Sequence, residues 1–295
     1  MIEFGFEFQA MASACELRLL GDDERALQRA AQAAIAEVRR IERKYSRYDA
    51  ASVVSRINAA AGSGQAVPVD DETTGLLNFA AQLHALSDGR FDITSGVLRR
   101  VWDFRAGRLP GIAEVEALLP LIGWSRVAFD GHQIALPQAG MEVDFGGFGK
   151  EYAADRAAAL LRHAGVPGGY VNLGGDIAVL GPRVDGSGWR LGIHHPRRAD
   201  AMIETLELGM GALATSGDYE RCFEADGVRY CHLLDPRSGW PVRYWQSVSV
   251  VAPSCAAAGA ACTIAMVSGE RGLAFIREQS LPFLAVDAHG VVIRS

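Results

Sequence analysis

The order in which strand-like and helix-like patterns follow one another most constrains the fold of this chain. Amphipathic helical patterns occupy residues 23–46, 71–88 and 149–165, and short strand-like segments crowd between residues 169 and 252. This order is neither a strict alternation of strand and helix nor an all-β succession. It predicts an α+β fold of mixed, largely antiparallel sheets with packed helices.

Shorter patterns complete the expected organisation. Two strands are expected within residues 4–20, and the Asp130-Gly131 dipeptide is typical of a hairpin turn. The other expected elements are a short helix at 52–58, another near 112–122, strands near 125–129, 133–136 and 142–145, helices near 254–267 and 270–279, and two terminal strands. We see no repeat, linker or low-complexity stretch, so we expect one domain, with residue 140 as the expected place of any division into two subdomains.

Charge and hydropathy exclude two classes of function. The chain has 29 Lys and Arg against 35 Asp and Glu, a net charge of −6, whereas a general nucleic-acid binder needs a basic face. No run of about eighteen uncharged apolar residues is present, so no membrane span is expected.

The first residues and the cysteines predict the compartment. Residues 1–8 carry acidic side chains at positions 3 and 7 in a strand-like alternating pattern, unlike the basic and then apolar order of a secretory signal, and no lipobox cysteine follows. The five cysteines are an odd number without CxxC or metal-type spacing, which indicates reduced thiols. We therefore expect a cytoplasmic protein; an export signal that had been removed would leave the same pattern.

The segment 144–152 is the first that could carry chemistry. A strand-like stretch runs through glycines into the helix that holds Lys150, and glycines before a helix N-terminus favour the approach of an anion. A Walker A loop is excluded, because it would need Gly at Asp144 and Ser or Thr at Glu151. A tight turn with a surface lysine is the alternative.

Three further segments combine glycines with polar side chains. Gly174-Gly175-Asp176 offers either ligand-facing backbone or a glycine bulge between strands. His232 stands at the end of an expected strand, where a neutral imidazole could act as a general base or stabilise the following turn by hydrogen bonds. Residues 89–98 place an aromatic side chain in a polar loop, either to stack on a flat ring or to anchor the core.

These segments stand in one order, and together they resemble the FAD:protein FMN transferases, the ApbE family, formerly called thiamine-biosynthesis lipoproteins. Each piece is weak, but the ordered set is specific and covers nearly the whole chain. The matching segments are Met11, Ser46-Arg47-Tyr48, Phe91-Asp92-Ile93-Thr94, Asp144 through Asp155-Arg156, Gly174-Gly175-Asp176, Thr215 through Tyr219, His232 through Pro241, and Thr263.

The resemblance implies a fold and a reaction. The fold would be the ApbE-like (T-fold-like) architecture. The enzyme would cut the diphosphate of FAD, attach FMN to a Thr or Ser hydroxyl of an acceptor protein, and release AMP. Family acceptors carry a short Asp-x-x-Ser/Thr-Gly segment.

The resemblance also assigns residues to the reaction. His232 would be the base for the acceptor hydroxyl, and Lys150 a catalytic cation beside the diphosphate. The residues that would bind FAD are Met11, Tyr48, Arg90, Phe91, Asp92, Asp144, Lys150 and Leu233. A phosphate contact by Arg237 is our own hypothesis, from its place in the turn after His232.

The chain departs from the family pattern where Mg²⁺ would bind. The resemblance implies carboxylates in the helix of Thr263, but Gly259 and Cys262 stand at their positions, which leaves Thr263 and the Gly147 carbonyl as metal ligands. Neutral oxygens alone hold Mg²⁺ weakly, because this hard cation prefers anionic oxygen. Glu151 stands where the family has Gly, and it would either replace the lost ligand or repel the diphosphate.

Three functions are consistent with these residues. The first is an FMN transferase with a weakened or rewired metal site. The second is an FAD-binding relative that has lost transfer and serves as a carrier or regulator. The third is an FAD diphosphatase that yields FMN and AMP. All three require FAD binding.

Overall fold

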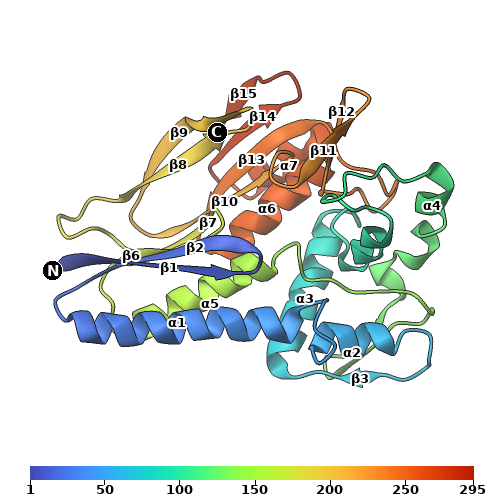
Figure 1. Cartoon of the computed structure of the whole chain (residues 1–295), viewed down its shortest axis with the longest axis horizontal. Coiled ribbons are helices and arrows are strands. Elements are labelled where there is room, and N and C mark those ends of the chain that lie inside the picture. Colours follow the sequence, from blue (N-terminus) through green and yellow to red (C-terminus); the bar gives the residue numbers. More distant parts are fainter.

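The computed structural model describes residues 1–295, and its centre is one sheet of eight strands (Figure 1). The strands are β1 (Ile2–Ala10), β2 (Ser13–Gly21), β6 (Gly169–Leu173), β7 (Asp176–Gly181), β10 (Gly211–Gly217), β13 (Trp245–Ala252), β14 (Phe283–Asp287) and β15 (Val292–Arg294). They lie side by side in this order, and every neighbouring pair is antiparallel. The expected α+β fold with largely antiparallel sheets is confirmed.

Helices cover one face of this sheet, and a two-stranded hairpin covers the other. The helices are α1 (Glu24–Tyr45), α5 (Gly149–His163) and α6 (Cys255–Val267), and α1 and α5 lie side by side along the sheet in Figure 1. The hairpin is formed by β8 (Trp189–His195) and β9 (Arg198–Leu208). Its buried side chains, such as Trp189 and Leu191, pack against Leu213 and Val286 of the main sheet.

Smaller elements stand beside the sheet. They are α2 (Val53–Ala59), α3 (Asp71–Leu86), α4 (Ile112–Glu116), α7 (Gly272–Glu278), the three-stranded sheet β3 (Val67–Pro68), β5 (Gln133–Ala135) and β4 (Ala128–Phe129), the hairpin β11 (Cys222–Ala225) and β12 (Val228–Cys231), and the 3-10 turns Ile93–Arg100, Leu119–Leu121, Trp124–Arg126 and Gly269–Arg271. The helices predicted at 23–46, 71–88 and 149–165 are all present, as α1, α3 and α5.

The largest core lies between the sheet and its helices, because the apolar side chains of both face one another. The apolar residues of α1 recur at helical spacing and are buried: Leu27, Ala31, Ala34, Val38 and Ile41. On α5 the buried positions 153, 154, 157 and 158 are all alanine. These small side chains allow α1 and the sheet to approach α5 closely. The N-terminus of α5 lies at the turn between β6 and β7, two inner strands of the sheet.

The strand expected at 142–145 is wrong. In sequence, the apolar Val143 and Phe145 alternate with the acidic Asp144, which is the pattern of a strand. In the structure, Val143 and Phe145 are buried and Asp144 is less so. Their backbone has no strand partner, because the Val143 N–H donates to the Asn58 side chain at 2.7 Å and the Asp144 N–H donates to the Ile93 carbonyl at 2.9 Å. The segment is an irregular loop anchored on both sides, and it carries Asp144 toward the start of α5.

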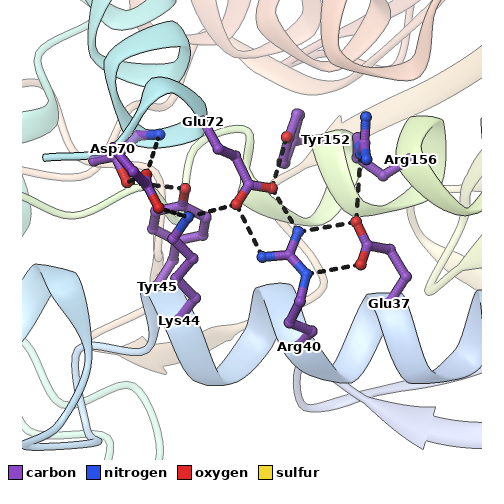
Figure 2. A network of polar contacts seen from close by, with 9 residues as sticks. Glu37, Arg40, Lys44, Tyr45, Asp70, Glu72, Tyr152 and Arg156 are labelled. Atoms are coloured by element: carbon purple, nitrogen blue, oxygen red, sulfur yellow. Dashed lines mark hydrogen bonds and ion pairs between the residues drawn. The ribbon is translucent and has the colours of Figure 1, made fainter.

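A polar network joins α1, α3 and α5 (Figure 2). Both carboxylate oxygens of Glu72, on α3, accept hydrogen bonds from the Arg40 guanidinium at 2.6 and 2.9 Å. The same carboxylate accepts from Lys44 at 2.6 Å and from the Tyr152 hydroxyl at 2.9 Å. Tyr152 adjoins Glu151 in α5, so this network positions the helix that carries the candidate site.

No helix combines the length and the apolar composition that a bilayer crossing needs. All five cysteines are free thiols, as expected. The cytoplasmic compartment stays a prediction.

Candidate functional site

One cavity of about 940 Å³ lies where the β1–β2 turn, the β6–β7 turn, the loop into α5 and the segments after β10 and β12 come together. All eleven predicted site residues line this cavity: Met11, Tyr48, Arg90, Phe91, Asp92, Asp144, Gly147, Lys150, His232, Leu233 and Thr263. Arg237 does not line it. Its guanidinium pairs with Asp88 at 2.9 Å, so the hypothesis of a phosphate contact by Arg237 is wrong.

Met11 and Ala12 form the turn between β1 and β2, and both have positive φ, 52° and 56°. Non-glycine residues rarely adopt this left-handed conformation, so the surrounding structure must hold the turn in place. Glu42 of α1 accepts a hydrogen bond from the Met11 N–H at 2.5 Å. Sequence reasoning missed Glu42, because it is one of several acidic residues on an amphipathic helix.

In the segment Arg90-Phe91-Asp92, the Arg90 side chain lines the cavity, whereas the other two side chains are anchored in the protein. The ring of Phe91 is buried and stacks on Phe148 with 6.1 Å between centroids. The Asp92 carboxylate accepts hydrogen bonds from the N–H groups of Thr94 at 2.8 Å and Trp124 at 2.9 Å. Phe91 and Asp92 therefore anchor the loop, which was one of the two alternatives, and their contact with FAD stays a prediction.

Asp144 is held by two arginines that sequence reasoning did not assign. Its carboxylate accepts from Arg47 Nη1 at 2.9 Å and lies 3.4 Å from Arg99 Nε. It also accepts from the Gly146 N–H at 2.8 Å, which shapes the turn before α5. Arg47 stands next to Tyr48, whose side chain is 86% exposed at the cavity mouth and is free to stack on a flat ring.

Lys150 is fixed by the β6–β7 turn. Its Nζ lies 2.8 Å from Asp176 Oδ2 and 3.3 Å from the Gly174 carbonyl oxygen. Burial by itself lowers the pKa of Lys150, but the carboxylates of Asp176 and Glu151 outweigh it and raise the pKa, so the ammonium stays charged. Asp176 belongs to the segment Gly174-Gly175-Asp176 that the sequence singles out, but its ion pair with Lys150 forms only because β7 packs beside α5.

Glu151 lies in the first turn of α5 with its carboxylate buried against α6. Oε2 has no hydrogen-bond partner. Burial, with a smaller contribution from the charge of Asp176, raises the pKa of Glu151 to about 8. A Cβ atom on Gly259 would lie only 2.5 Å from Oε1, so the carboxylate occupies the space of the missing side chain. No three His, Cys, Asp or Glu side chains converge into a metal-binding group.

His232 follows β12 directly, and its backbone N–H donates to the Arg221 carbonyl at 2.9 Å. Its Nδ1 atom is buried without a hydrogen-bond partner. Burial, together with the nearby charges of Arg221 and Arg99, lowers the pKa of His232 to about 4. The imidazole is therefore neutral at pH 7, the form that a general base requires.

Three of the six cationic side chains on the cavity wall, Arg90, Arg190 and Arg221, form no ion pair. They come from the loop before the 3-10 turn at Ile93, from β8, and from the segment before β11. Unpaired guanidinium groups on a shared wall can bind the oxygens of a phosphate in pairs. Sequence reasoning missed Arg190 and Arg221, which lie outside the glycine-rich motifs.

The model of the ApbE family matches residues 11–285. This chain belongs to the ApbE family.

Curated ApbE relatives resemble most of the chain. The FAD:protein FMN transferase of Vibrio cholerae is 33% identical over 248 residues, which are 82% of this chain and 74% of that protein. The FAD:protein FMN transferase of Klebsiella pneumoniae is 32% identical over 283 residues, 94% of this chain and 86% of that protein.

Solved ApbE structures share the whole fold. The ApbE protein of Thermotoga maritima has a TM-score of 0.92 at 32% identity and covers 100% of this chain and 97% of its own. The apo form of the flavinyl transferase ApbE of Pseudomonas stutzeri has a TM-score of 0.85 at 30% identity, with 100% and 95% coverage.

Proposed function

We propose that this ApbE-family chain is an FAD:protein FMN transferase, which moves FMN from FAD onto a Thr or Ser hydroxyl of an acceptor protein. The observation that carries the proposal is a single cavity on whose wall a neutral His232, a charged Lys150 and unpaired arginines stand together. An imidazole that accepts a proton and cations that balance phosphate charge are the groups that phosphoryl transfer requires.

The residues of the cavity divide by chemistry into two sets of FAD contacts. Met11 and the exposed Tyr48 offer an adaptable and a flat apolar surface for the ring systems. Lys150 and the free guanidinium groups of Arg90, Arg190 and Arg221 supply positive charge for the diphosphate. The ordered β1–β2 and β6–β7 turns keep these groups in place before FAD arrives, which reduces the entropy lost on binding.

The proposed reaction exchanges the phosphoanhydride bond of FAD for a phosphoester bond to the acceptor. The acceptor hydroxyl oxygen forms a bond to the phosphorus of the FMN half, while the bond from that phosphorus to the bridging oxygen breaks. AMP leaves with the bridging oxygen, and the hydroxyl proton passes to the imidazole of His232. Lys150 and the arginines balance the charge that develops on the phosphate oxygens.

The donors near α5 fit a hard cation in chemical type. Glu151 has a buried oxygen without a partner, and the Thr263 hydroxyl and the Gly147 backbone line the same cavity. Oxygen donors that include a carboxylate suit Mg²⁺. A bound Mg²⁺ would add positive charge next to the diphosphate.

The experiment that tests the proposal follows all three products. The protein is incubated with FAD, Mg²⁺ and a peptide that carries Asp-x-x-Thr-Gly, and a matched peptide with Val in place of Thr is the control. We expect a peptide mass increased by one FMN, together with equimolar AMP, and neither product with the Val peptide. FMN and AMP without labelled peptide would indicate a diphosphatase, and FAD binding without any product would indicate a carrier; either result would refute the transferase.

A further inference from the structure

Where α5 and α6 meet, a large residue on α5, Glu151, faces a residue without a side chain on α6, Gly259. A Cβ atom on Gly259, on α6, would lie 2.5 Å from Oε1, 2.6 Å from Cγ and 2.9 Å from Cδ of Glu151, on α5. These are its three nearest atoms, and such distances are far below van der Waals contact. The glutamate can therefore take this position only because residue 259 has no side chain.

The register of the two helices places this contact and makes it firm. The Asp155 carboxylate on α5 accepts hydrogen bonds from the N–H groups of Cys255 at 2.7 Å and Ala256 at 2.9 Å, at the start of α6. One helical turn before Asp155 is Glu151, and one turn after Cys255 is Gly259. The Asp155 cap thus aligns the two helices so that Glu151 faces Gly259.

The Glu151 carboxylate is free to bind a further group. The residue is 9% exposed, yet its Oε2 atom has no hydrogen-bond partner, which is costly for a buried oxygen. Lys150, its neighbour in sequence, forms its ion pair with Asp176 at 2.8 Å and forms none with Glu151. Glu151 also lines the cavity, along with Thr263, which lies one turn beyond Gly259 on α6 and whose hydroxyl is 3.4 Å from that of Ser216.

We propose that Glu151 supplies, from α5, the carboxylate that a divalent cation needs in this cavity, in place of the side chain that α6 lacks at Gly259. The cation would be a hard ion such as Mg²⁺ or Mn²⁺, with the Thr263 hydroxyl and the Gly147 carbonyl as neutral oxygen donors. This inference rests on the proposed function for the reason to expect a cation. Its evidence is the contact between Glu151 and Gly259 and the Glu151 Oε2 atom that has no hydrogen-bond partner.

The test measures metal binding directly, without turnover. Binding of Mn²⁺ to the full-length protein is followed by electron paramagnetic resonance of the free ion, and binding of Mg²⁺ by calorimetry, both without FAD and with FAD at saturation. Three variants are compared with the wild type: E151Q, which keeps the shape but cannot ionise, E151G, and the double variant E151G/G259D, which moves the carboxyl group to α6. E116Q, on the exposed face of α4, is the matched control.

We expect E151Q and E151G to weaken Mn²⁺ binding at least about tenfold, the smallest loss typical of damage to a metal's surroundings. The double variant should regain most of this affinity, and E116Q should bind as the wild type does. Circular dichroism verifies that each variant is folded. Wild-type affinity in E151Q, or failure of the wild type to bind Mn²⁺ with and without FAD, would overturn the proposal.

The two proposals can fail separately. If Mn²⁺ binding depends on Glu151 but no FMN reaches the peptide, the metal site stands and the transferase falls. If FMN transfer proceeds equally in E151Q and in wild type at every Mg²⁺ concentration, the transferase stands and Glu151 is not its metal ligand.

Discussion

At the scale of the residue, burial sets the protonation state of the proposed base. We expect His232→Asn to lower kcat for FMN transfer about 10²- to 10⁴-fold, the usual contribution of a general base, with FAD affinity retained. Because burial and two nearby arginines lower the pKa of His232 to about 4, the wild-type imidazole loses its base function only as the pH falls toward that value. The acidic limb of a kcat/KM profile should therefore lie near pH 4, well below the ordinary 6.5 of histidine.

Arg237→Gln is a suitable control for this profile. Arg237 carries the charge of a phosphate ligand but pairs with Asp88 outside the cavity, so its loss should leave transfer almost unchanged. An acidic limb near 6.5 in the wild type, or full activity in His232→Asn, would contradict the assignment of His232.

A second residue-scale prediction concerns Gly259. Gly259→Ala should lower the free energy of unfolding by about 1–3 kcal/mol, the usual cost of overpacking, since the new methyl group meets the Glu151 carboxylate. Gly75→Ala is the matched control, because this exposed glycine of α3 has open space around its Cβ position and alanine there should add about 1 kcal/mol. Chemical denaturation measures both changes.

The cause of the loss at Gly259 can be isolated with a double variant. In an E151G background the methyl group at 259 no longer meets a carboxylate, so most of the penalty should disappear. An equal penalty in both backgrounds would show that another neighbour, and not Glu151, excludes a side chain at 259.

At the scale of the elements, one carboxylate holds three helices together. Glu72→Gln should lower the free energy of unfolding at pH 7 by about 2 kcal/mol, because charge-assisted hydrogen bonds from Arg40 and Lys44 are lost or weakened. Glu72 is 19% exposed, so solvent screens these contacts only in part. Glu116→Gln, on an exposed face without partners, is the control and should change stability little.

This stabilisation by Glu72 has a defined pH dependence. Burial raises the pKa of Glu72, but hydrogen bonds from Arg40, Lys44 and Tyr152 outweigh it and lower the pKa from 4.5 to about 2. A depressed carboxylate pKa stabilises the folded state above 4.5, and this contribution is lost as the pH falls from about 4.5 through 2. The difference between wild type and Glu72→Gln should shrink over that range, and a constant difference would argue against the charge.

At the scale of the whole molecule, the sheet and the cavity join the two halves of the chain. β2, before residue 140, pairs with β6, after it, and the largest core holds residues from both sides. We predict a single unfolding transition, with a ratio of calorimetric to van't Hoff enthalpy of about 1. FAD at about 100 times its Kd should shift this one transition by about 2.7 kcal/mol. Two separated transitions, or a fragment 141–295 that folds alone, would show that the chain divides near residue 140.

Much of the architecture could be predicted from local patterns. The apolar spacing of α1 and the Asp23 side chain that accepts from the Arg25 and Ala26 N–H groups are written within a few residues, so this helix and its start are readable in sequence. The strand predicted at 142–145 is wrong, because alternation of polar and apolar residues does not reveal whether another strand lies alongside. The residues of the cavity were found through ordered motifs, whereas Arg190 and Arg221 reach it from segments without a motif.

The amino-acid sequence by itself determined which elements form and which side chains are available for chemistry, since helix period, strand alternation and capping act over short stretches of chain. Only the tertiary structure decided which of those side chains meet. Glu151, the neighbour of Lys150 in sequence, faces Gly259, the one glycine of α6. Burial lowers the pKa of His232 below its ordinary value. Both outcomes depend on how helices and sheets pack across distant parts of the chain, which no local pattern encodes.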